Sequence, residues 1–124
     1  MKMWIQQHDF TSEEVDGATK EQAKKALATF DWQSEILKEK ESKEETCPSG
    51  LGLISDSNEI LHICPRASES CLVHYHYSTQ KKLLGFIPVK NQGSHFVESC
   101  SIAKAMDLID HHFDGNQEEI LKIN

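Results

Sequence analysis

The sequence predicts an α+β domain in which a four-stranded antiparallel meander is flanked by an N-terminal helix and a C-terminal amphipathic helix. Three observations predict this fold. Apolar residues recur at helical spacing before Cys47 and again after Ser99. Between these points, short apolar runs alternate with short polar loops. The length of 124 residues suits a single domain over 1–124.

The N-terminal part is predicted to be mainly helical over 19–45, after a segment, 1–18, that is irregular or lies at an edge. Thr19 is the expected N-cap, and Gln22 follows at the spacing of a capping box. Trp32 begins a stretch that is a poor helix interior, so a break near 30–32 is expected. Whether 31–45 is helix or strand stays open. The helical stripe consists of Ala23, Ala26, Leu27 and Phe30.

The middle of the chain, 50–90, is predicted to form the meander. Its apolar runs are 51–54, 60–63, 71–77 and 83–89. The loops between them hold three to five polar residues, which is typical of hairpin connections.

These loops predict a strand register. A first turn at 56–58 pairs Leu51 with Ile63, and a second loop at 66–70 pairs Ile63 with Val73. A third loop at Ser78–Lys82 pairs Val73 with Ile87. One face of the sheet then forms the core, and its residues are Leu51, Leu53, Leu61, Ile63, Val73, Tyr75, Leu83 and Ile87.

The opposite face gathers three histidines on an otherwise apolar surface, with His62 directly opposite His74. Three interpretations are open: a helix or arm covers this face, a protein partner binds it, or it holds zinc. The zinc ligands would be His62, Cys64, His74 and His76. The remaining residues of the face are Ile54, Ile60, Leu72, Leu84 and Phe86.

The C-terminal helix is predicted over 99–114. Ser99 or Ser101 is the expected cap, and Gly115 supplies a left-handed C-terminal residue. His111 and His112 lie near the helix end, where a partly positive imidazole suits the helix dipole. The face expected to dock on the sheet carries Ile102, Ala105, Met106, Ile109 and Phe113.

Charge and composition exclude several classes of function. The net charge is −7 and Arg66 is the one arginine, which argues against a nucleic-acid partner. No apolar run reaches the roughly 20 residues that cross a bilayer, and the N-terminus turns polar at Gln6, so neither a membrane span nor a signal peptide is expected. The four cysteines form no C-x-x-C pair, which fits reduced thiols and a cytoplasmic location.

Catalytic signatures are missing from the sequence. It contains no G-x-S-x-G, P-loop or G-x-G-x-x-G motif, and its acidic pairs lie in solvated runs. We therefore expect a protein that is not an enzyme and needs no cofactor, zinc being required only if the histidine face binds metal.

In size, acidity and α+β outline the chain resembles two groups of small bacterial proteins. These are the immunity proteins that neutralise a cognate toxin and the secretion chaperones that hold an effector's leader segment. The secretion chaperones usually place a helix between strands three and four, which the loop at Ser78–Lys82 cannot hold, so the immunity proteins are the better match.

The resemblance implies a protein partner, and the acidic first half of the chain suits a basic toxin domain. Residues 1–62 hold 13 acidic and 7 basic residues. Asp31, Glu35 and Glu39 share one face if 31–40 is helical, and Trp32 is the expected aromatic anchor beside them.

Overall fold

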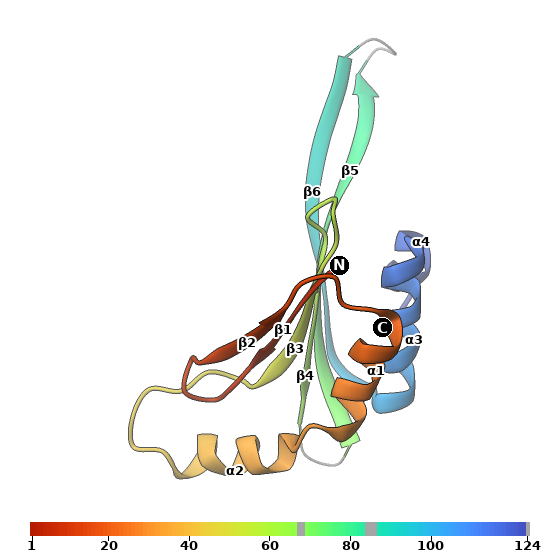
Figure 1. Ribbon diagram of the computed structural model, residues 1–124. Coiled ribbons are helices and arrows are strands. Elements are labelled where there is room, and N and C mark those ends of the chain that lie inside the picture. The colour runs from red at the N-terminus through yellow and green to blue at the C-terminus, as the bar shows by residue number, and fades with distance from the viewer. Residues whose placement is uncertain (67–68, 84–86, 124) are drawn as a thin grey trace.

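The computed structural model describes residues 1–66, 69–83 and 87–123, and for 78–83 and 87–92 it describes the backbone. These residues form an antiparallel sheet in the order β2-β1-β3-β4-β5-β6. Figure 1 shows the helices α1 (Lys20–Thr29), α3 (Ile102–Asp114) and α4 (Gln117–Leu121) on one face of this sheet. The strands are β1 (Lys2–Gln6), β2 (Ser12–Val15), β3 (Gly50–Ile54), β4 (Ile60–Pro65), β5 (Ser70–Leu83) and β6 (Ile87–Ser101).

The α+β prediction is confirmed, but the sheet has six described strands instead of four. The segment expected to be irregular or an edge, 1–18, supplies the two additional strands. β1 lies inside the sheet, with Met3 opposite Leu53 of β3, and β2 forms the edge beside it. All four residues of β2 are exposed, as is usual for an edge strand.

The predicted register of the central strands is confirmed. Leu51 pairs with Ile63, Ile63 pairs with Val73, and His62 pairs with His74. A shift of one residue would have moved every side chain to the other face, so the apolar alternation specifies this pairing strongly.

The predicted third loop is wrong. Ser78–Lys82 continues β5, whose last residue, Leu83, pairs with Ile87. Val73 consequently pairs with Val97 instead of Ile87. Leu84 and Phe86, which were expected on the face opposite the core, lie outside the described residues.

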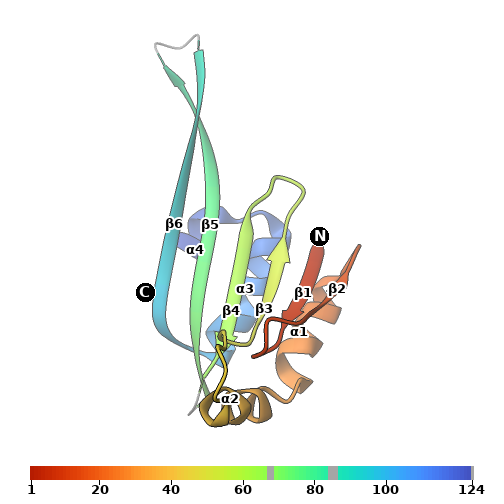
Figure 2. The ribbon, with the colours of Figure 1, turned by 90° about the vertical axis from the view of Figure 1, so that its left-hand side faces the viewer.

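The long β5–β6 hairpin extends beyond the rest of the sheet. β4 pairs with β5 from Pro65 to Ile60, which lies opposite His76. Past His76, the described pairing is between β5 and β6 alone, over residues 77–83 and 87–93. Figures 1 and 2 show this part as a two-stranded ribbon that rises above the body of the protein. We call residues 77–83 and 87–93 the arm.

The hydrophobic core lies between the sheet and the helices. Leu51, Leu61 and Tyr75 are fully buried on the helix-facing side of the sheet. Ala105 and Ile109 of α3 (Ile102–Asp114) are fully buried against them, as the sequence predicted. Because this face is apolar on every central strand, the helices remove it from water and provide most of the hydrophobic stabilisation.

The helices begin and end where local sequence signals place them. Thr19 caps α1 (Lys20–Thr29) in a complete capping box with Gln22, and α2 (Trp32–Glu41) starts after the expected break. Ser101 caps α3, and Gly115 ends it in the left-handed conformation with φ of 74°. A short helix, α4 (Gln117–Leu121), follows. Among the described residues, we find no helix with the length and apolar character needed to cross a membrane.

Candidate functional site

The face of the sheet opposite α1 and α3 is the candidate site. Figure 2 views the molecule from this side, with α1, α3 and α4 behind the strands and α2 at the lower end. The strand register aligns one row of side chains across it. Trp4 lies opposite Gly52, Gly52 opposite His62, His62 opposite His74, and His74 opposite Phe96. We call this surface the open face.

Trp4 lies flat on the sheet because Gly52 leaves room for it. A Cβ atom at Gly52 would lie 2.0 Å from the Trp4 ring, closer than any real contact. The indole crosses that position and stacks on His62, with ring centroids 5.7 Å apart. A glycine in the middle of a strand therefore has a packing role here: it admits a large ring that covers exposed backbone.

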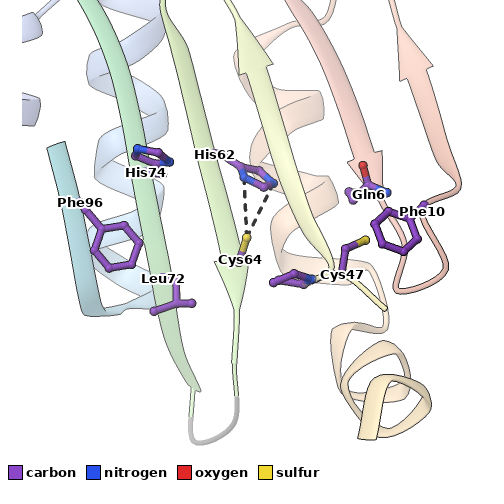
Figure 3. A pocket seen from close by; sticks show the side chains of 9 residues that line it. Gln6, Phe10, Cys47, His62, Cys64, Leu72, His74 and Phe96 are labelled. Carbon is purple, nitrogen blue, oxygen red and sulfur yellow. Dashed lines mark hydrogen bonds between the residues drawn. The ribbon is translucent and has the colours of Figure 1, made fainter. Parts of the chain in front are cut away.

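A cavity of about 320 Å³ occupies the lower half of the open face. Figure 3 shows its lining, with side chains contributed by several strands and by the segments that carry Phe10 and Cys47. Phe10 and Phe96 line it and remain 57% and 55% exposed. The full lining consists of Gln6, Phe10, Cys47, Pro48, His62, Cys64, Leu72, His74 and Phe96.

The histidines of the open face influence one another. The rings of His74 and His76 have centroids 4.1 Å apart, and His74 meets Phe96 edge-on at 5.9 Å. Burial lowers the pKa of His62, and the nearby His74 and His76 lower it further. Burial also lowers the pKa of His74, with His76 as the second cause. Both rings are therefore neutral at pH 7.

Cys64 lies beside His62, as the zinc hypothesis requires, with its Sγ 3.7 Å from Nε2. Burial raises the pKa of the Cys64 thiol to about 11, so the thiol stays protonated at pH 7 without a metal ion. Within residues 1–66, 69–83 and 87–123, no three His, Cys, Asp or Glu side chains are grouped so that they could hold a metal ion. His62, Cys64, His74 and His76 share a face without forming a ligand shell in this part of the chain.

The structure places Trp32 in the core. Its side chain is 6% exposed, its Nε1–H donates to the carbonyl oxygen of Leu27, and its ring packs on Phe30. The indole thus holds α2 to the end of α1. It is not available as an aromatic anchor on the surface.

The three acidic candidates of this segment have separate environments. Asp31 is exposed and caps α2 by accepting a hydrogen bond from the Ser34 amide. Glu39 is half-buried and pairs with Arg66, at 3.1 Å between Oε2 and Nη1. Glu35 is 5% exposed, so the structure does not bring the three carboxylates together on one solvent-facing surface.

Glu35 instead ties α2 to the end of β1. It accepts a hydrogen bond from the His8 backbone N–H at 3.0 Å and lies 2.6 Å from the His8 ring Nδ1. Burial alone would raise the pKa of Glu35, but these two hydrogen bonds and the charge of His8 lower it. The carboxylate is therefore ionised and structural at neutral pH.

His112 has a structural role that differs from the expected dipole interaction. Its ring is 4% exposed, and its Nε2–H donates to the carbonyl oxygen of Leu53 at 3.1 Å. Burial lowers the pKa of His112, which keeps the ring neutral although it lies in the last turn of α3. The hydrogen bond joins α3 to the back of β3.

Sequence reasoning missed the aromatic residues of the open face. Trp4 comes from a strand that was not predicted, and Phe96 lies in the part of β6 beyond the predicted meander. Phe10 precedes β2 and has a positive φ of 68°. The alternation of Met3 and Ile5 with Lys2, Trp4 and Gln6 was only a weak strand signal for β1, because Trp4 is itself apolar and the segment extends over five residues.

Comparison of the chain with known protein families, with curated proteins and with solved structures found no match.

Proposed function

We propose that this chain is a non-enzymatic protein-binding domain and that the open face of its sheet is the contact surface. The observation that carries the proposal is the pair of exposed phenylalanines, Phe10 and Phe96, that flank a 320 Å³ cavity on a face without a covering helix among the described elements. Apolar and aromatic side chains around a cavity are typical of the centre of a protein interface.

The neutral state of the histidines supports this role. A partner that covers His62 and His74 removes them from water, and burying a charged ring would cost far more than burying a neutral one. Since burial and the neighbouring histidines already lower the pKa of both rings, His62 and His74 are neutral at pH 7 and can be desolvated at lower cost.

The partner we propose is a basic protein, such as the toxin domain neutralised by an immunity protein. The chain carries a net charge of −7, and the excess of acid lies in residues 1–62, the half that contributes Trp4 and Phe10 to the open face. Opposite net charges speed encounter, and an apolar contact then holds the complex. An exported effector's leader segment is the second candidate, on the resemblance to secretion chaperones.

The experiment is affinity capture from extracts of the source cells, with bound proteins identified by mass spectrometry. The test variant is Phe10→Ser/Phe96→Ser, and the control is Leu37→Ser, because Leu37 on α2 is an equally exposed apolar residue at 57%. We expect one partner that binds the wild-type protein and Leu37→Ser but is lost from the double variant. Equal capture by all three proteins would disprove the proposal.

With the purified partner, the electrostatic contribution to the association rate can be measured by varying the salt concentration. We expect the association rate to fall several-fold between low and physiological salt, because screening weakens the attraction between opposite net charges. An association rate independent of salt would exclude a basic partner.

A further inference from the structure

The arm differs in charge from the rest of the chain. Residues 77–83 and 87–93 carry Lys81, Lys82 and Lys90, three of the 13 basic residues, and none of the 20 acidic ones. A basic arm therefore projects from an acidic body (Figure 1). It suits an acidic surface and would repel the basic partner proposed for the open face.

The arm also has an edge available for strand addition. A ribbon of two strands is marginally stable in water, because each strand has a neighbour on one side only. On the β6 side, Pro88 has no N–H to donate to a further strand. On the β5 side, residues 77–83 contain no proline, and the described β4 ends at Ile60, opposite His76. The free β5 edge of the arm is the one that can accept another strand.

The acidic surface that matches this edge is β2. It forms the opposite edge of the sheet, all four of its residues are exposed, and its sequence is Ser-Glu-Glu-Val. Glu14 pairs with Lys2 at 3.3 Å, but both side chains are about half exposed, so the pair contributes little and can be exchanged. β2 thus offers the backbone groups of an edge strand together with Glu13 and Glu14.

Within one molecule the arm cannot reach β2, because β5 and β2 are separated by β4, β3 and β1 (Figure 2). We propose that the arm of one copy adds as a strand to the β2 edge of a second copy, so that the protein self-associates in solution. An antiparallel alignment places Lys81 opposite Glu14 and Lys82 opposite Glu13. Opposite charges directly across a strand pair stabilise it, and like charges destabilise it.

Sedimentation velocity of the full chain over a wide range of concentration tests this proposal. We expect the sedimenting mass to rise above 14.1 kDa as concentration increases and to return toward it at high salt. The variants K81E/K82E and E13K/E14K are each expected to weaken association about tenfold or more, because both create like-charge pairs. In an equimolar mixture of the two variants, both contacts between unlike copies, arm on β2 in either direction, carry opposite charges, so the mixture is expected to associate again.

Two further proteins keep the test decisive if reversed charges disturb folding. The control K40E/K43E changes the net charge by the same amount as K81E/K82E. Its substitutions lie at exposed residues of α2 and of the segment after it, so it is expected to associate like the wild type. A variant in which Asn-Gly replaces residues 79–91 joins the paired residues Ser78 and Gln92 by a tight turn, and is expected to be a folded monomer by circular dichroism.

A wild-type protein that stays at 14.1 kDa at every concentration would overturn the proposal, as would association unaffected by K81E/K82E. Binding to vesicles of phosphatidylcholine with phosphatidylserine is measured in a separate experiment. Co-sedimentation of a monomeric wild-type protein with them, lost in K81E/K82E, would overturn the proposal in favour of a lipid surface. Because Phe10 and Phe96 are not part of this contact, failure here leaves the proposed function of the open face unaffected.

Discussion

The contact between Trp4 and Gly52 shows how one residue without a side chain can determine a surface. We expect Gly52→Ala to destabilise the protein by about 1–3 kcal/mol, because the new methyl group overlaps the indole and the ring must move. Chemical denaturation measures the loss. In a Trp4→Ala background the same substitution is expected to cost much less, since the obstructing ring is gone. Equal costs in both backgrounds would show that the ring does not occupy the Gly52 position.

Single residues also show the limit of interpretation from sequence. Glu35 and Asp31 are both acidic and four positions apart, yet Glu35 is buried beside His8 and Asp31 is an exposed cap. Helical spacing correctly predicted that the two residues lie at similar angles around the helix axis, but it did not predict that one is buried and the other exposed. It could not show that β1 would end against that face, because His8 is 27 residues away from Glu35 in the chain.

At the scale of the elements, α3 has the strongest amphipathic pattern and makes the clearest prediction. Ile109 is fully buried against the sheet, so Ile109→Ala is expected to cost about 2–4 kcal/mol of unfolding free energy. The matched control is Leu37→Ala on α2, where a 57% exposed side chain is expected to change stability by less than about 0.5 kcal/mol. Similar losses for the two variants would contradict the docking of α3 on the sheet.

The predicted elements were those that form an apolar run bounded by polar turn residues. β3, β4 and the lower part of β5 satisfy this condition, and the short loops between them predicted their register. β2 does not, because all its residues are exposed and leave no apolar signal. The polar stretch from Ser78 to Lys82 was assigned to a loop for the same reason, although a ribbon beyond the sheet needs no buried face.

For the molecule as a whole, buried histidines make stability depend on pH. Burial lowers the pKa of His62 and His112 from the ordinary value of 6.5, so the unfolded chain takes up protons at a higher pH than the folded protein. The folded protein is therefore more stable above pH 6.5, and its unfolding free energy decreases as the pH falls below 6.5. The lowered pKa of Glu35 adds a further loss at more acidic pH, below its ordinary value of 4.5.

We expect a smaller unfolding free energy at pH 5.5 than at pH 7.5, measured by urea denaturation. His112→Gln keeps a donor for the Leu53 carbonyl and removes one titrating ring, so it is expected to reduce this difference by up to about 1.4 kcal/mol. A difference of the same size in the variant would show that His112 does not contribute to acid sensitivity.

The strand order has a consequence for the path by which the protein folds. β3, β4, β5 and β6 are joined to one another in sequence, so their pairings close short loops and form early. β1 pairs with β3 only after the chain has passed through both α1 and α2. This pairing closes a longer loop than the pairings among β3, β4, β5 and β6, so its entropy cost is larger. During synthesis on the ribosome, β1 must wait for β3 to emerge, and Trp4 reaches its position over Gly52 as a late event. The aromatic surface of the open face is therefore completed only when the N-terminal hairpin joins a sheet that has already begun to form.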